Sequence, residues 1–446
     1  MREPAVPGSL GPSGVVTIHP SIPQGSLRAP PSKSYTHRAL VLGVLSEQRL
    51  RIRNPLSSED TLASLEATEA FGRTVHREPS GSAWTIETGS VGARGEDRRI
   101  DCRESGTTLR LFTTVAARDD VETRFAGRPS LARRPMNGLW NALEDLGAVV
   151  RRPPSGDGLP FSVRGPIHPG EIDIETSTTS QYLSSLLMVL PTLPGPSRIR
   201  VIGSRVSHPY VEATLAILER FGGTWRVETW GYGTPGAQRY KGEEFEVPGD
   251  ASSAAYFWAW ATLTGGEVRV EGSLQEWPQA DLALLEVLPH LGARVVRTTE
   301  AITVKGGSPS ERSPFEFDLS QSPDLAPILG VLAAFVPGES HLKGMDRLIH
   351  KESDRREQTA RLVRALDARA EREASTMKVW GPPGKDHLNL WDLEDHRVLL
   401  SAVVAATALS RPSRLGPAHA CQKSYPGFFA DAEGVGLVWT EGERDP

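Results

Sequence analysis

The chain has 446 residues, with 50 Lys and Arg against 55 Asp and Glu, so its formal net charge is −5. This length suggests two or three domains with large cores. The acidic balance argues against a nucleic-acid or membrane-surface partner. Two cysteines, Cys102 and Cys421, exclude a disulfide framework and a multi-cysteine metal site, and they fit a reducing cytoplasm. No apolar stretch reaches the roughly 18 residues that span a bilayer. Residues 1–14, rich in Pro and Gly, are expected to form a loose tail.

Six segments share one pattern, in which a few small polar residues precede an apolar helical run. They begin 70 to 74 residues apart, at Lys33, Gly106, Ser180, Asp250, Pro323 and Asp395. An apolar residue followed by Gly, or once by Asp, is expected to close a helix in each repeat, at Gly72, Gly147, Gly222, Gly292, Asp367 and Gly436. The sequence therefore indicates a sixfold repeat of strand–helix–strand–helix–strand–strand. A continuous solenoid and two closed groups of three both remain open, although typical solenoid repeats are shorter, at about 20 to 45 residues.

The helical runs 39–45, 183–190 and 398–409 are apolar nearly all round, which predicts buried helices. Helices inside a ring of sheets would bring their polar N-termini together, and free N–H groups there favour anions. Residues 250–253 are interpreted as a helix cap, because no basic residue accompanies them. The other starts carry long or charged side chains: Lys33, Arg38, Arg110, Gln181, Asp324, His396 and Arg397.

Lysine is scarce, with 8 of the 50 basic residues, yet Lys33, Lys351 and Lys423 all lie in polar motifs. In the run 351–355, helical spacing would put Lys351 and Arg355 on one face beside Glu352. A solvated ion-pair helix is one interpretation of this run. A site for a small polyanionic substrate with acid–base chemistry is the other.

Nine motifs stand in the order seen in the enolpyruvyl transferases, and the chain most closely resembles the 5-enolpyruvylshikimate-3-phosphate synthase family from about Ile18 to Phe429. The motifs are residues 31–40, 105–110, 134–135, 180–183, 249–254, 323–324, 351–355, 395–397 and 423–426. The resemblance implies an α/β fold, a two-lobed inside-out barrel with three repeats and buried helices in each lobe. It places one lobe at 30–248, with shikimate-phosphate motifs. The other is placed at 1–29 plus 249–446, with acid–base and phosphoenolpyruvate motifs.

The implied reaction transfers the enolpyruvyl group of phosphoenolpyruvate to the 5-hydroxyl of shikimate 3-phosphate, without a metal or organic cofactor. Asp324, Glu352, Lys33 and Lys423 are the implied catalytic residues. The implied shikimate 3-phosphate ligands are Ser34, Arg38, Thr179, Ser180, Gln181, Ser207, Tyr210, Asp324 and Lys351. The implied phosphoenolpyruvate ligands are Lys33, Gly106, Arg134, Gln181, Arg355, His396, Arg397 and Lys423. A cytoplasmic monomer that is sensitive to glyphosate, through Gly106, is expected.

Four positions depart from the family pattern: Glu104 and Arg347, each in place of a frequent Asn, Ile349 in place of Arg, and Thr179 in place of Ser. Two other functions remain open. A UDP-N-acetylglucosamine enolpyruvyl transferase usually carries a reactive Cys in the stretch equivalent to 125–135, where this chain has none. A non-catalytic anion-binding relative is the other alternative. Cys102 and Cys421 are interpreted as small core residues.

Overall fold

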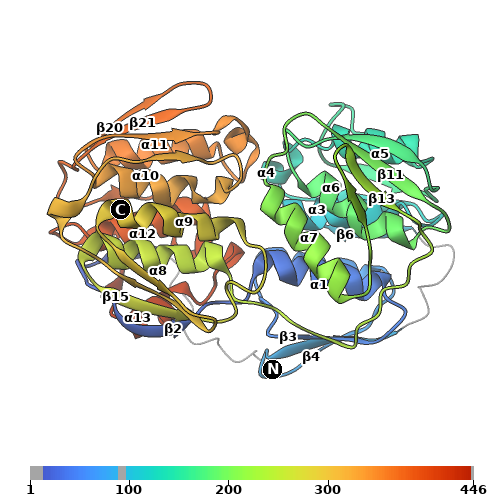
Figure 1. Ribbon diagram of the computed structural model, residues 1–446, viewed down its shortest axis with the longest axis horizontal. Coiled ribbons are helices and arrows are strands. Elements are labelled where there is room, and N and C mark those ends of the chain that lie inside the picture. Colours follow the sequence, from blue (N-terminus) through green and yellow to red (C-terminus); the bar gives the residue numbers. More distant parts are fainter. Residues whose placement is uncertain (1–13, 89–96, 443–446) are drawn as a thin grey trace. The chain divides into compact units, whose positions relative to one another are not determined.

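The computed structural model describes residues 14–88 and 97–442, so the expected N-terminal tail lies outside it except for Gly14. The described chain divides into two compact units. The inserted unit comprises 31–248 with 277–279, and the discontinuous unit comprises the described parts of 1–30, 249–276 and 280–446. Each unit is mixed α/β (Figure 1). No helix among the described residues combines the length and apolar character needed to cross a bilayer.

The inserted unit has six α-helices of at least nine residues and one shorter helix among its described residues. The helices are α1 (Lys33–Leu45), α2 (Glu59–Ala70), α3 (Gly106–Ala116), α4 (Pro129–Ala132), α5 (Asn137–Asp145), α6 (Gln181–Val189) and α7 (His208–Arg220), with the 3₁₀ turn η1 (Leu190–Thr192). The strands are β3 (Leu50–Arg53), β4 (Val75–Arg77), β5 (Ala83–Ile86), β6 (Arg98–Asp101), β7 (Thr123–Ala126), β8 (Val149–Arg151), β9 (Phe161–Arg164), β10 (Glu171–Glu175), β11 (Ser197–Ile202), β12 (Arg226–Glu228), β13 (Gly231–Thr234) and β14 (Glu244–Glu246).

The discontinuous unit contains the remaining elements. Its α-helices are α8 (Ala251–Thr264), α9 (Leu284–Val287), α10 (Ala326–Ala334), α11 (Arg355–Ala365), α12 (His396–Thr407) and α13 (Phe428–Gly434). Its 3₁₀ helices are η2 (Ala280–Ala283), η3 (Leu288–Leu291), η4 (Pro309–Glu311), η5 (Pro323–Leu325), η6 (Asp346–His350) and η7 (Ala418–Lys423). Its strands are β1 (Val15–Ile18), β2 (Gln24–Arg28), β15 (Glu267–Glu271), β16 (Arg294–Arg297), β17 (Ala301–Lys305), β18 (Glu316–Asp318), β19 (Gly338–Lys343), β20 (Arg369–Arg372), β21 (Met377–Gly381), β22 (Asn389–Leu390), β23 (Ser413–Leu415) and β24 (Trp439–Gly442).

The described strands form six open four-stranded sheets, three in each unit, and all six have the same pairing pattern. In the sheet β10-β11-β13-β12, the first pair is parallel, with Glu171 opposite Arg198, and the other two pairs are antiparallel. A helix connects the two parallel strands, as the parallel geometry requires. Distant strands complete three of the sheets, since β14 pairs with β3, β2 with β15 and β1 with β23.

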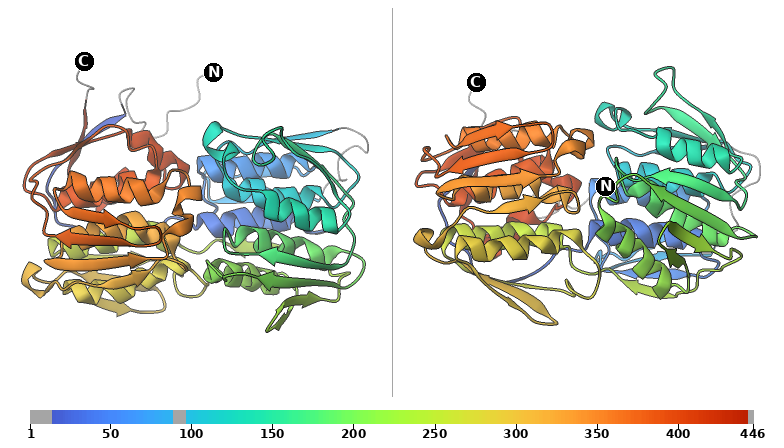
Figure 2. Two further views of the ribbon diagram at one scale, coloured as in Figure 1. Left: turned by 90° about the horizontal axis from the view of Figure 1, so that it is seen from above. Right: turned by 45° about the horizontal axis from the view of Figure 1, so that its top comes forward.

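The apolar helices lie inside each unit and the strands lie on the outside (Figure 2). Helices α1, α3, α6 and α7 contact one another in the inserted unit, and α8, α10 and α12 do so in the discontinuous unit. The buried helices predicted at 39–45, 183–190 and 398–409 are confirmed, because almost every side chain of α1, α6 and α12 is buried. Each unit therefore has its own hydrophobic core.

The residues predicted to close the helices have the expected left-handed backbone conformation. Gly72, Gly222 and Gly292 each have φ of +78°, and Gly147 and Gly436 have φ of +103° and +109°. Asp367, which replaces Gly in the fifth of these markers, has φ of +59°, a conformation that Asp tolerates better than most residues. These turns reverse the chain from each helix into the next strand.

Candidate active site

The guanidinium of Arg355 holds three carboxylates together in the discontinuous unit. Arg355 is the first residue of α11 and only 1% exposed. Its Nη1 lies 2.7 Å from Asp324 Oδ1, its Nη2 lies 2.5 Å from Glu352 Oε2, and its Nε lies 2.9 Å from Asp395 Oδ2. These contacts raise the pKa of Arg355 despite its burial. The cation remains charged and fixes the carboxylates in place.

Asp324, in η5 before α10, is the most heavily paired acid of this cluster. Its Oδ1 also lies 3.2 Å from Lys351 Nζ, and its Oδ2 lies 2.8 Å from Arg397 Nη2. Burial raises the pKa of Asp324, but Arg397, Lys351 and Arg355 outweigh it and hold the pKa well below its ordinary value. Burial lowers the pKa of Lys351 to about 8, although Asp324 opposes that shift.

Asp395 joins the start of α12 to this cluster. It is the N-cap residue of α12, and its Oδ1 accepts a hydrogen bond from the backbone N–H of Arg397 at 3.0 Å. Burial raises the pKa of Asp395, but Arg355 and then His396 bring it down to about 2. His396, which is 1% exposed, places Nδ1 3.9 Å from Asp395 Oδ1. Lys423 is buried at the end of η7, which packs against α12.

The run 351–355 is not the helical turn that its spacing predicted. Helix α11 begins only at Arg355, because Asp354 caps it by accepting hydrogen bonds from the backbone N–H groups of Arg356 and Glu357. Lys351 and Glu352 precede this cap in irregular structure, and each reaches the cluster from the loop. The solvated ion-pair helix is therefore excluded for this run.

In the inserted unit, Arg38 joins α1 to α7. Its Nε donates to Thr214 Oγ1 at 2.9 Å, its Nη2 donates to the carbonyl of Tyr210 at 2.8 Å, and its Nη1 donates to the carbonyl of Ser34 at 2.9 Å. The side chain is buried, which lowers its pKa to about 10. Arg38 thus fixes the positions of Ser34 and Tyr210.

Lys33, at the first position of α1, contacts α2 through an ion pair of 3.0 Å between its Nζ and Asp60 Oδ2. Asp60 is buried, and its carbonyl accepts a 3.3 Å hydrogen bond from Thr108 of α3. The starts of α1, α2 and α3 are therefore joined, as a shared site requires.

Gly106, at the start of α3, lies against two guanidinium groups. A Cβ at this position would come within 2.9 Å of Arg134 Nη1 and 3.0 Å of Arg110 Nη1. Arg110 Nη1 in turn donates to Gln181 Oε1 at 2.6 Å, and Gln181 Nε2 donates to Thr107 Oγ1 at 3.0 Å. Gly106, Arg134 and Gln181 are therefore brought together at the starts of α3 and α6.

The remaining predicted hydroxyl residues lie at helix starts. Thr179 Oγ1 accepts a hydrogen bond from the backbone N–H of Gln181 at 3.2 Å, and Ser180 is the buried N-cap residue of α6. Ser207, the N-cap residue of α7, has φ of +51°. Asp250 caps α8 by accepting from the N–H of Ser253 at 2.8 Å, so the capping role predicted for that motif is confirmed.

The residues that depart from the family pattern differ in their burial and in their contacts. Glu104 accepts a hydrogen bond from Ser130 and lies 3.8 Å from Arg128, so its added charge is partly paired. Arg347 is buried in η6 and donates to the carbonyl of Ser320. Ile349 is 40% exposed.

Both cysteines are buried, as predicted, and burial raises the pKa of each thiol, for Cys421 to about 12. Cys102 directly follows β6.

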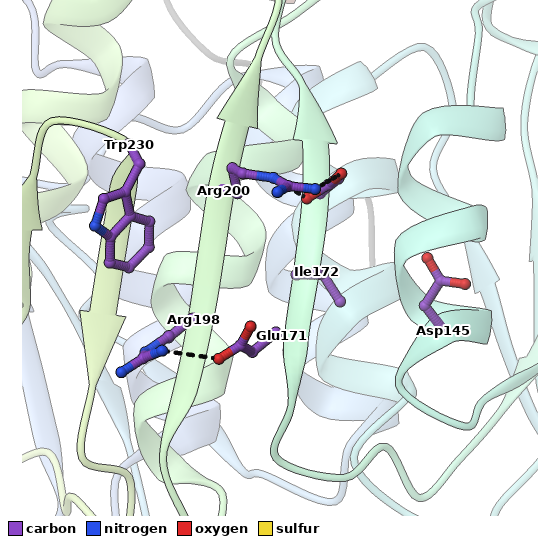
Figure 3. A pocket seen from close by; sticks show the side chains of 7 residues that line it. Asp145, Glu171, Ile172, Arg198, Arg200 and Trp230 are labelled. Atoms are coloured by element: carbon purple, nitrogen blue, oxygen red, sulfur yellow. Dashed lines mark hydrogen bonds and ion pairs between the residues drawn. The ribbon is translucent and has the colours of Figure 1, made fainter.

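A hollow on the outer face of the sheet β10-β11-β13-β12 is lined mainly by charged residues (Figure 3). It does not include any of the candidate site residues described above. Its arginines are paired across β10 and β11, Arg198 with Glu171 at 2.9 Å and Arg200 with Asp173 in a two-nitrogen contact. The parallel register places these residues opposite each other. The arginines of this hollow are already paired with carboxylates in exposed ion pairs, which contribute little to stability.

Two residues that the sequence did not single out as ligands hold candidate cations: Asp60 holds Lys33 in the inserted unit, and Asp395 holds Arg355 in the discontinuous unit. Asp395 is the first residue of the sixth polar motif, so its place in the repeat indicates a residue at a helix start. Asp60 lies inside an ordinary first helical turn, where an acidic residue is expected for helix stability alone.

A family model described as EPSP synthase (3-phosphoshikimate 1-carboxyvinyltransferase) matches residues 19–431. The 3-phosphoshikimate 1-carboxyvinyltransferase of Methanocorpusculum labreanum is 35% identical over 94% of this chain and 97% of that protein. The enzyme of the same name from Methanocella arvoryzae is 37% identical over 92% and 96%. Among solved structures, an EPSP synthase from Acinetobacter baumannii matches with a TM-score of 0.77 and 23% identity over 96% of this chain and 99% of that chain. The enolpyruvyl transferase NikO from Streptomyces tendae matches with a TM-score of 0.78 and 17% identity over 97% and 99%, which is a likeness of fold.

Replacing Arg355 should destabilise the discontinuous unit strongly. We expect Arg355→Met to reduce the free energy of unfolding by about 3–5 kcal/mol, because it removes the cation beside the buried carboxylate of Asp395. Urea unfolding followed by tryptophan fluorescence measures the change.

Arg361→Met is the matched control on the same helix, since Arg361 makes a bidentate pair with the exposed Asp392 at 2.6 Å. Arg361→Met should reduce the free energy of unfolding by at most about 1 kcal/mol, because it removes only an exposed ion pair. Equal effects of the two substitutions would contradict the central role of Arg355.

Proposed function

Because the chain belongs to the EPSP synthase family, we propose that it transfers the enolpyruvyl group of phosphoenolpyruvate to the 5-hydroxyl of shikimate 3-phosphate and releases phosphate. The observation that carries this proposal is the pair of acids Asp324 and Glu352 on the single buried guanidinium of Arg355. Two carboxylates fixed beside cations suit a reaction that adds one proton and removes another while anionic substrates are bound.

The shikimate 3-phosphate ligands that the family resemblance implies are kept as part of this proposal. These residues are Ser34, Arg38, Thr179, Ser180, Gln181, Ser207, Tyr210, Asp324 and Lys351. Hydroxyls, helix-start N–H groups and the fixed guanidinium of Arg38 suit a phosphate ester.

Phosphoenolpyruvate is assigned to a more strongly cationic set. It comprises Lys33, Gly106, Arg134, Gln181, Arg355, His396, Arg397 and Lys423. The contact of Gly106 with the Arg134 and Arg110 guanidiniums supports this assignment, because a side chain at position 106 would displace those cations.

The chemistry follows from the two acids. Glu352 gives a proton to C3 of phosphoenolpyruvate, while Asp324 accepts the proton of the 5-hydroxyl as its oxygen bonds to C2. The bond from C2 to the phosphate oxygen then breaks, the proton held by Asp324 passes to the departing phosphate, and the carboxylate of Glu352 takes a proton back from C3 to restore the double bond. Lys33 and Lys423 stabilise the charge that develops on the substrate oxygens.

The proposal includes the detailed fold of the two units. The two units are assigned as the two lobes of an inside-out α/β barrel with three repeats each, which the six sheets of common pairing support. The expected cytoplasmic location, monomeric state and glyphosate sensitivity stay predictions.

A phosphate-release assay tests the function directly. We expect phosphate release from phosphoenolpyruvate that depends on shikimate 3-phosphate, with no release when UDP-N-acetylglucosamine replaces it. Turnover with the nucleotide sugar would favour the sister transferase. Tight binding of both substrates without turnover would favour a non-catalytic relative.

Proton exchange separates the roles of the two acids. Glu352→Gln should slow exchange of C3 hydrogens with deuterated water by about 10² or more, because it removes the acid at C3. Asp324→Ala should keep this exchange while product formation falls, since a cation at C2 forms and reverts without attack by the hydroxyl. Nuclear magnetic resonance of phosphoenolpyruvate measures exchange. Loss of exchange in Asp324→Ala would reverse the assignment.

Lys351 should make shikimate 3-phosphate binding sensitive to alkaline pH. Since its pKa is about 8, against an ordinary 10.5, the free protein loses this positive charge as pH rises through 8. We expect the Kd to rise roughly tenfold from pH 7 to pH 9 by calorimetry. Lys351→Met should bind weakly at both pH values, whereas Lys385→Met, which removes an exposed lysine, should keep the wild-type slope. A Kd of wild type that is flat to pH 9 would contradict the role of Lys351.

A further inference from the structure

Two carboxylates face different nitrogens of Arg397. Nη2 pairs with Asp324 at 2.8 Å, whereas Nη1 lies 4.0 Å from Asp281 Oδ2. Asp281 belongs to η2, which packs against α8. Asp281 is not part of any of the polar motifs found in the sequence. Arg397 is also buried, so these acids restrict the orientation of its guanidinium.

Ser252 holds Asp281 in this position. Its hydroxyl, in the first turn of α8, donates to Asp281 Oδ2. The neighbouring residues of that polar motif, Asp250 and Ser253, form the helix cap, which makes no use of the Ser252 hydroxyl. The fourth motif therefore does more than cap its helix.

Fold stability does not account for the carboxylate of Asp281. The residue is 1% exposed, and its Oδ1 has no hydrogen-bond partner within the described part of the chain. Burial raises its pKa to about 6, although Arg397 opposes the shift, so folding disfavours its ionised form. Above pH 6 the ionised group therefore costs stability relative to a neutral side chain.

We propose that Asp281, held by Ser252, is a positioning residue that fixes the guanidinium of Arg397 for binding phosphoenolpyruvate, an inference that rests on the function proposed above. Asp324 must also exchange a proton in that function, so it is not a constant partner for Arg397. Asp281 supplies a second partner that takes no part in the chemistry. The other groups that face this pair are Tyr256, whose hydroxyl interacts with Arg397, and Asp250.

Steady-state kinetics of the full chain at pH 7.5 test this role. Asp281→Asn should raise the KM for phosphoenolpyruvate about tenfold and leave the KM for shikimate 3-phosphate within about twofold. Ser252→Ala should raise the same KM about threefold, and Ser252→Thr, which keeps the hydroxyl, should restore it. The melting temperature of Asp281→Asn should equal or exceed that of wild type, which a merely structural acid would not give.

A double-mutant cycle links the effect to Arg397. In an Arg397→Lys background, Asp281→Asn should change the KM for phosphoenolpyruvate less than twofold, because the guanidinium that it positions is gone. Asp431→Asn is the matched control, since Asp431 likewise accepts a hydroxyl hydrogen bond, from Tyr425 at 2.8 Å, and should leave both KM values unchanged.

Several kinetic results would contradict the role proposed for Asp281. If the acid merely repelled an anionic substrate, Asp281→Asn would lower the KM for phosphoenolpyruvate, and that outcome overturns the proposal. Unchanged KM values, or effects that add in the double mutant, overturn it as well while the proposed function stands. A wild-type chain without substrate-dependent phosphate release overturns both.

Discussion

The buried guanidinium of Arg355 is the constraint on which the polar end of the discontinuous unit depends. It joins the loop before α11, the start of α10 and the cap of α12 through Glu352, Asp324 and Asp395. The carboxylate of Asp395 is buried and those of Asp324 and Glu352 are half-buried, and such groups are stable only beside a cation and additional donors. Ser353 supplies one such donor, to Asp395 at 2.8 Å. The arrangement holds Asp324 and Asp395 ionised and fixed, and an ionised Asp324 can accept a proton.

In the inserted unit, two buried arginines donate to neutral acceptors, whereas Lys33 is paired with the carboxylate of Asp60. Arg38 donates to a hydroxyl and two carbonyls, and Arg110 donates to the amide of Gln181. These acceptors of the two arginines are neutral, so the contacts do not cancel their positive charge. The chain has a net charge of −5, yet such cations would favour an anionic ligand locally. Local pairing, rather than total charge, decides where the positive potential lies.

The apolar helices make these polar helix ends possible. Helices such as α1 and α12 are buried along nearly their whole length, so their starts are held rigidly by the core. A helix start fixed in this way presents its N–H groups and first-turn side chains without further ordering on binding. Each unit has three sheets with the same pairing pattern, so the arrangement that supports the helices occurs three times in each unit. Rigid support of many short polar motifs is what lets residues that are far apart in the sequence form one cluster.

The sequence by itself determined the features that depend on neighbouring residues. Polar residues before apolar runs located the starts of α1, α3 and α12, and Gly222 or Asp367 located helix ends, because capping and left-handed turns are local interactions. The motif order also identified the family. Only the tertiary structure decided that Lys351 and Glu352 act from a loop, because the cap formed by Asp354 competes with helical spacing. It likewise decided that Asp60, Asp281 and Asp395 hold the cations. Each of these pairings joins side chains 27 to 116 residues apart, and their choice depends on packing and desolvation that no local pattern encodes.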